Sequence, residues 1–345
     1  MKKRIFLVPA LIVCIQVFYL LQLLLMPKYR GADRDGALIA EYYAHAGNHD
    51  VIFVGDCEVY ENFSPAVLWQ EYGISSWVRG SPQQTVWQSC CLMEETFRYE
   101  TPKVMVFNVL SMKYDSPEST GPHREAYNRM TLDGMRWSSC KWRAIQASMT
   151  KEERQWDGMF TYLFPILRFH ERWSQLTGED FRYLFRREEV SDGGYLMQSG
   201  VKPVTANHAS PPLADYAFGE NSYAWLDRMV KVCRDHGTQL ILIKAPSLYP
   251  VWWEEWDRQM EDYAAENGLL YLNFLDDQEE IDLDWQTDTY DAGLHLNLRG
   301  AEKLSRYFGQ TLRDMGMPDR RGDPLYEGAW AELTARYEQR KLQIQ

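Results

Sequence analysis

The sequence lacks the cysteine patterns of metal sites and the basic stripe of nucleic-acid-binding proteins. Its six cysteines form no CxxC pair and no metal-ligand spacing, and no disulfide framework is visible, so we expect neither a metal nor another cofactor. The net charge is −12 and no run of Lys and Arg offsets it, which argues against nucleic acid as a partner. Internal repeats and low-complexity segments are also absent.

Only one long apolar run is present, at residues 5–26, and it contains no charged residue. At 1.5 Å per residue, such a helix is long enough to cross the roughly 30 Å hydrocarbon core of a bilayer. The run ends without the small-residue cleavage site of a signal peptide, so we expect an uncleaved anchor whose partner is the lipid bilayer. Three basic residues precede the run, and only Lys28 and Arg30 closely follow it. This bias favours a cytoplasmic N-terminus and an extracytoplasmic body.

The body alternates short apolar runs with helical patterns, which predicts an α/β domain with a mostly parallel sheet covered on both faces. The expected domain spans 31–316, after an anchor region at 1–30. An insertion at about 112–220 interrupts it, and a charged helical tail at 317–345 follows as an appendage. The expected strands are Val51–Val54, Ser76–Val78, Val104–Leu110, Leu240–Ile243 and Leu269–Phe274.

Capping signals predict where several helices begin and end. One helix is expected from Ser64-Pro65 to Gly73, a second from Ser81-Pro82, and a third from about Asn221 to Gly237. Two more are expected, one from Pro250 to Gly268 and one after Asn297.

Residues suited to acyl transfer follow the predicted strands, where open α/β sheets bind their ligands. Cys57 is a candidate nucleophile, His295 a candidate base, and Asp291 the acid that would orient His295. The oxyanion could be bound by backbone N–H groups of Cys57 and Gly80 and by the amide of Asn108.

The order of these motifs resembles the SGNH/GDSL hydrolase superfamily: "GDC" at 55–57, then Gly80, Asn108 and "DAGLHLN" at 291–297. The resemblance implies a flavodoxin-like three-layer sandwich and esterase or acyltransferase chemistry. With its anchor, the chain also resembles exported proteins of D-alanyl transfer to teichoic acid and of alginate O-acetylation. That likeness implies a glycan or polymer substrate and a membrane-bound O-acyltransferase as a partner.

Two departures from the superfamily pattern leave alternatives open. Cys57 stands where Ser is usual, so it is either a thioester-forming nucleophile or a small buried residue at a strand end. Three residues, rather than two, separate Asp291 from His295, so Asp288 or Asp56 could support the base instead. Asn108 and Gly80 could equally be turn residues, and the whole domain could be an inactive glycan-binding or scaffold subunit.

Overall fold

The fold is described by a computed structural model that covers residues 2–27, 36–121, 124–155, 158–186, 189–205 and 209–344. Five parallel strands form one sheet in the order β2-β1-β3-β4-β5. This is the flavodoxin-like order, and it confirms the predicted fold class. The strands are β1 (Val51–Gly55), β2 (Ser76–Gly80), β3 (Val104–Asn108), β4 (Gln239–Lys244) and β5 (Leu270–Asn273).

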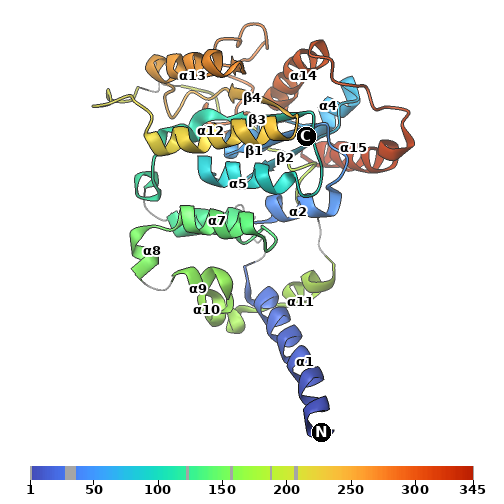
Figure 1. The fold of residues 1–345 in the computed structure, drawn as a ribbon. Helices are drawn as coiled ribbons and strands as arrows, with labels where there is room; N and C mark the ends of the chain where they lie inside the picture. Colours follow the sequence, from blue (N-terminus) through green and yellow to red (C-terminus); the bar gives the residue numbers. More distant parts are fainter. Residues whose placement is uncertain are drawn as a thin grey trace.

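Helices cover both faces of the sheet, which is why the central strands are continuous apolar runs rather than alternating ones (Figure 1). One face packs against α2 (Ala37–His45), α5 (Val86–Thr96), α12 (Glu220–Asp235) and α13 (Glu254–Asn267). The other face packs against α4 (Pro65–Tyr72), α14 (Leu298–Asp314) and α15 (Pro324–Ile344).

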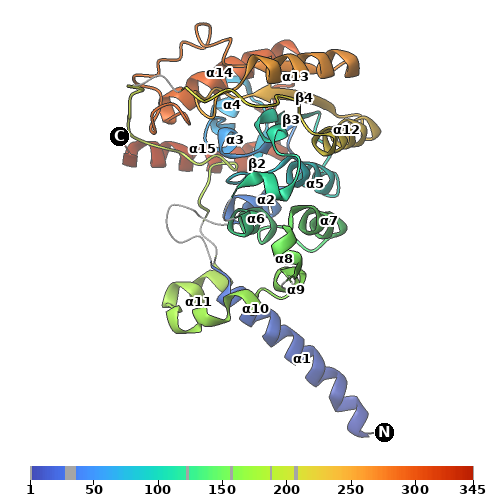
Figure 2. The ribbon, with the colours of Figure 1, turned by 90° about the vertical axis from the view of Figure 1, so that its left-hand side faces the viewer.

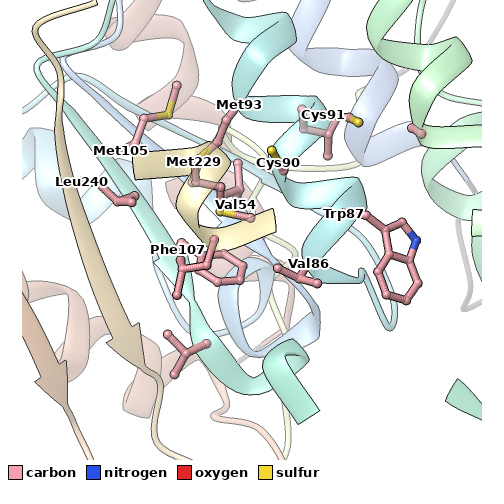
Figure 3. Close-up of a cluster of buried hydrophobic side chains, with 14 of the residues drawn as sticks. Val54, Val86, Trp87, Cys90, Cys91, Met93, Met105, Phe107, Met229 and Leu240 are labelled. Carbon is pink, nitrogen blue, oxygen red and sulfur yellow. The ribbon is translucent and has the colours of Figure 1, made fainter. Parts of the chain in front are cut away.

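The core on the α5 and α12 side shows how alternate strand residues meet the helices (Figure 3). Val54, Met105 and Phe107 project from the sheet toward these helices. Cys90 and Cys91 lie on α5 and are fully buried, so they pack as small apolar residues.

Most predicted helix ends agree with the structure, and two beginnings differ. Ser64 caps α4 by accepting from the Val67 N–H, and Gly73 ends the helix with a left-handed φ of 65°. The helix expected at Ser81 begins instead at Val86, where Thr85 and Gln88 form a capping box. The helix expected at Pro250 is α13, and it starts later, at Glu254.

The segment between β3 and α12 extends from the sheet domain toward the N-terminal helix (Figures 1 and 2). Its regular elements are η1 (Val109–Lys113), η2 (Pro117–Thr120), α6 (Arg124–Leu132), α7 (Ser139–Ser148), α8 (Lys151–Gln155), α9 (Gly158–Leu163), α10 (Ile166–Phe169), η3 (His170–Gln175) and α11 (Gly178–Phe185). The chain then returns to the sheet domain. There the Leu196 N–H donates to Tyr60 O, and the Lys202 N–H donates to Thr289 O.

The N-terminal helix α1 (Lys2–Leu25) projects away from the sheet domain (Figure 1). Its stretch Val8–Leu25 is long and apolar enough to cross a membrane. Lys28 and Arg30, on which part of the orientation argument depends, lie outside the described residues. The orientation therefore stays a prediction.

The C-terminal helix α15 is not the appendage that its charge suggested. It packs on α4, where Trp330 stacks on Trp69 with ring centroids 4.9 Å apart. Its buried side chains recur at helical spacing, so one apolar stripe faces the core although most other positions are polar. They are Tyr326, Trp330, Leu333 and Tyr337.

Candidate active site

Cys57 lies where β1 turns sharply into the short helix α3 (Cys57–Tyr60). Asp56 caps this helix by accepting a hydrogen bond from the Glu58 N–H, and it leaves Cys57 in the first turn. The turn requires Gly55, because a Cβ there would lie 2.4 Å from Val59 Cγ2 and 3.0 Å from Asn108 Cβ. The position is next to the β1–β3 pair, the switch point at which flavodoxin-like sheets bind ligands.

His295 lies in the loop before α14, and Asp291 holds it by two contacts. One carboxylate oxygen, Oδ1, accepts the backbone N–H of His295 at 2.8 Å, and Oδ2 lies 2.7 Å from Nδ1. The three intervening residues turn tightly, with Ala292 and Gly293 both at positive φ. The structure therefore brings Asp291 to His295 despite the unusual spacing.

Asp288, the spare acid, is not brought to His295. Its carboxylate pairs with Lys303 Nζ at 2.9 Å and with Arg299 Nε at 3.1 Å. It also accepts the Asp284 N–H, so it organises the loop and the start of α14.

His295 and Cys57 are electrostatically coupled, and one nitrogen of the His295 ring is not engaged by a carboxylate. Nδ1 must carry a proton because its carboxylate neighbours can only accept, whereas the buried Nε2 has no hydrogen-bond partner in the described part of the chain. Each group shifts the pKa of the other: His295 lowers that of the Cys57 thiol, and Cys57 raises that of His295. Among the cysteines of the body, Cys57 alone is partly exposed; Cys90, Cys91, Cys140 and Cys233 are buried.

A second carboxylate that the sequence analysis missed also faces His295. Glu61 Oε2 lies 3.2 Å from His295 Nδ1 and accepts the Tyr290 hydroxyl at 2.7 Å. Gln198 Nε2 donates to the other carboxylate oxygen at 3.0 Å. Two carboxylates therefore surround one imidazole nitrogen, and both favour the charged ring.

The electrostatics of the pair follow from these neighbours. Burial opposes a charge on His295, but Cys57, Asp291 and Glu61 outweigh it and raise its pKa to about 12. Burial raises the pKa of the Cys57 thiol, His295 opposes that rise, and Asp56 adds to it. The two groups titrate together, and a protonated His295 is the neighbour that stabilises a thiolate as it forms.

Asn108 is buried but does not point a free amide at Cys57. Its Nδ2 donates to Asp56 Oδ1 at 3.1 Å and to Glu58 Oε2 at 3.0 Å, and its Oδ1 accepts the Ala245 N–H. The predicted oxyanion donor therefore has both amide protons engaged. Its partner Glu58 forms a fully buried ion pair with Lys244 at 2.9 Å.

Gly80 lies at the end of β2, in register with Gly55. A Cβ at this position would lie 3.0 Å from both Cβ and Cδ1 of Tyr60. The absence of a side chain at Gly80 therefore makes room for Tyr60, and the oxyanion role of the Gly80 N–H stays a prediction. The backbone N–H of Cys57 could still donate to an oxyanion, because the first N–H groups of a helix have no acceptor within the helix.

Among the described residues, no group of three or more His, Cys, Asp and Glu side chains could hold a metal ion. The charged groups of the site instead pair with one another, directly and through hydrogen bonds. What the arrangement can do without a metal is form and stabilise a thiolate next to an imidazolium.

Comparisons with known proteins identify no family for this chain. No family model matches the sequence, and no curated protein matches it either. Among solved structures, the chain is similar to a Bacteroides fragilis protein described as a "putative acylhydrolase", with a TM-score of 0.40 and 12% identity. That match covers 80% of this chain and 94% of the other.

Proposed function

We propose that this chain transfers an acyl group through a thioester on Cys57. The observation that supports the proposal is the Asp291–His295 pair, whose imidazole is electrostatically coupled to Cys57 at the carboxyl end of β1. Asp291 fixes the ring orientation, and Nε2 has no hydrogen-bond partner among the described residues. A buried thiol that serves only as filler needs no oriented imidazole and no carboxylate behind it.

The reaction would proceed in two balanced steps. Cys57 gives its proton to His295, and the sulfur attacks the acyl carbonyl; the ester C–O bond breaks, and the leaving alkoxide takes the proton from His295. In the second step an acceptor hydroxyl gives its proton to His295 and attacks the thioester. The C–S bond then breaks, and the departing sulfur takes the proton back from His295, which restores the Cys57 thiol and the neutral imidazole.

The substrate side of the proposal rests on the anchor and on the resemblance to the SGNH superfamily. The helix α1 would hold the domain at the outer surface of a cell membrane, where an acylated envelope glycan or polymer is within reach. A membrane-bound O-acyltransferase is the partner that the resemblance implies as the source of the acyl group.

The test uses p-nitrophenyl acetate as an acyl donor and the purified full-length chain in detergent. The wild type should release p-nitrophenol and carry an acetyl group on the Cys57 peptide in mass spectra. Cys57→Ala and His295→Ala should lose both signals, whereas the buried-cysteine control Cys233→Ala should keep them. If Cys57→Ala matched the wild type, the acyl-transfer proposal would be refuted.

A non-catalytic scaffold is the second candidate, favoured by one observation. Because Asn108 is engaged by Asp56 and Glu58, the site offers fewer oxyanion donors than acyl transfer normally uses. Iodoacetamide distinguishes the two functions. A catalytic Cys57 should alkylate near neutral pH and slow markedly in His295→Ala, whereas a scaffold cysteine should be equally inert in both proteins.

A further inference from the structure

Short helices of the inserted segment surround the end of α1 that is nearest the domain (Figure 2). The elements α10, η3 and α11 contact α1, and α9 contacts α10. The Phe164 ring, just after α9, lies 6.1 Å from that of Phe18, and Arg172 donates to Leu25 O at 2.7 Å. These contacts hold the short helices against the last two turns of the apolar helix.

The same elements and the residues between them leave large apolar side chains exposed to 41% or more. Trp173 is 72% exposed and Phe185 is 86% exposed, values unusual for aromatic residues of a folded domain. We define the interfacial patch as the exposed apolar residues of this region: Phe160, Phe164, Leu167, Trp173, Phe181 and Phe185.

We propose that the interfacial patch lies in the headgroup layer of the bilayer that α1 crosses. The patch continues an apolar surface that begins on α1, since only a small share of the Val8–Leu25 span is buried against the protein. Phe18 precedes Leu25 by seven residues, about 10 Å along the helix axis at 1.5 Å per residue. That distance matches the depth of roughly 5–10 Å to which interfacial helices enter a membrane.

The charge of this region agrees with a membrane location. The whole chain carries −12, yet residues 158–186 contain four arginines against three carboxylates. Aromatic side chains mixed with arginine are the composition typical of helices that lie in the interface. The function of the contact would be to fix the height and tilt of the domain above the bilayer. The inference depends on α1 crossing the membrane and not on Cys57 chemistry.

Photo-crosslinking of the full-length chain in nanodiscs of phosphatidylcholine and phosphatidylglycerol tests the proposal. Benzoylphenylalanine replaces Trp173 or Phe185, which keeps an aromatic residue at each position. Val13 in α1 is the positive control, and Leu325 in α15, which is 62% exposed, is the matched negative control. We expect lipid adducts at 173 and 185 that approach the yield at 13 and exceed the yield at 325 several-fold.

The other outcomes would overturn the proposal. Lipid labelling at 13 but not at 173 or 185 would place the patch in water, and protein–protein adducts at 173 or 185 would assign it to a second copy. No labelling at 13 would remove the premise that α1 spans the bilayer.

Quenching by brominated lipid gives a second measurement on nearly native protein. Trp173→Phe should remove part of the tryptophan fluorescence that brominated lipid quenches. Trp142→Phe, which changes an exposed tryptophan on α7, should leave the quenched part unchanged. Equal quenching of the wild type and Trp173→Phe would contradict the proposal.

Discussion

Asp291 binds His295 at two points, through the backbone N–H at 2.8 Å and through Nδ1 at 2.7 Å. The first contact closes the turn that separates the two residues, and the second fixes the ring. The carboxylate therefore both builds the loop and sets the tautomer, so that Nε2 is the nitrogen left for proton transfer.

Asp291→Asn should keep the turn between residues 291 and 295 but no longer fix the tautomer of His295. The amide oxygen can still accept the backbone N–H, but the group no longer neutralises an imidazolium. We expect acyl transfer to p-nitrophenyl acetate to fall by about 10³–10⁴, as in other sites that lose this carboxylate. The matched change Asp288→Asn should lower the melting temperature but leave the activity per folded molecule close to wild type. Equal losses in both variants would contradict the assignment of Asp291.

Glu61→Gln should narrow the pH range in which His295 stays protonated. Glu61 lies 3.2 Å from Nδ1 and is one of the groups that raise the His295 pKa, so its removal should lower that pKa. The upper limb of the rate of Cys57 alkylation against pH should move down accordingly. Glu71→Gln changes an exposed carboxylate and should leave the profile unchanged.

Asp56→Asn should remove a pH dependence of stability. Burial and the charge of Glu58 raise the Asp56 pKa to about 6, from 3.8 in the unfolded chain. The native state therefore holds the Asp56 proton between about pH 4 and pH 6 while the unfolded state has released it, so wild-type stability should fall as pH rises through this window. The side-chain oxygen of an asparagine at this position can accept the same two hydrogen bonds that Asp56 Oδ1 accepts, from the Glu58 N–H and from Asn108 Nδ2. A melting-temperature series should lose this slope in Asp56→Asn and keep it in the exposed control Asp235→Asn.

The sequence was sufficient for the sheet and for the positions of the proposed reactive residues. Apolar runs and turn signals locate all five strands, and the "GDC" and "DAGLHLN" motifs locate Cys57 and His295. Both signals are local. A buried strand shows as a short apolar run, and the end of a strand shows as turn residues directly after that run.

Residues whose role depends on side-chain direction were missed. Glu61 follows Cys57 by four positions, the spacing that places two helical residues on one face. Lys244 ends a strand whose four preceding residues are apolar and buried, and a lysine there needs a buried partner. These two signals were present, but only the folded chain shows that the partners are His295 and Glu58. The sequence likewise did not show that neighbouring carboxylates engage the Asn108 amide, so its expected role as an oxyanion donor stays a prediction.

Asn108→Ala tests whether that amide serves catalysis. Loss of an oxyanion donor costs about 10²–10³ in turnover. Because Nδ2 is held by Asp56 and Glu58, we expect instead a lower melting temperature and a turnover per folded molecule close to wild type. Asn108→Asp, which adds a third carboxylate to this buried cluster, should destabilise the fold far more than Asn108→Ala. A large loss of turnover at unchanged stability would restore the oxyanion role.

The buried pair of Glu58 and Lys244 should show strong coupling in a double-mutant cycle. Both side chains are fully buried, so removal of one charge leaves the other without compensation, at a cost of about 3–5 kcal/mol in unfolding free energy. Glu58→Gln and Lys244→Met should each reach that range, whereas the double variant should lose much less than their sum, because no uncompensated charge of the pair remains. Chemical denaturation in detergent micelles measures all four proteins. Additive losses would show that the two residues act separately.

Alkylation of Cys57 in the double variant then reports whether the Glu58–Lys244 pair also positions α3. If the double variant regains stability but Cys57 alkylates more slowly than in the wild type, the pair holds Cys57 in place.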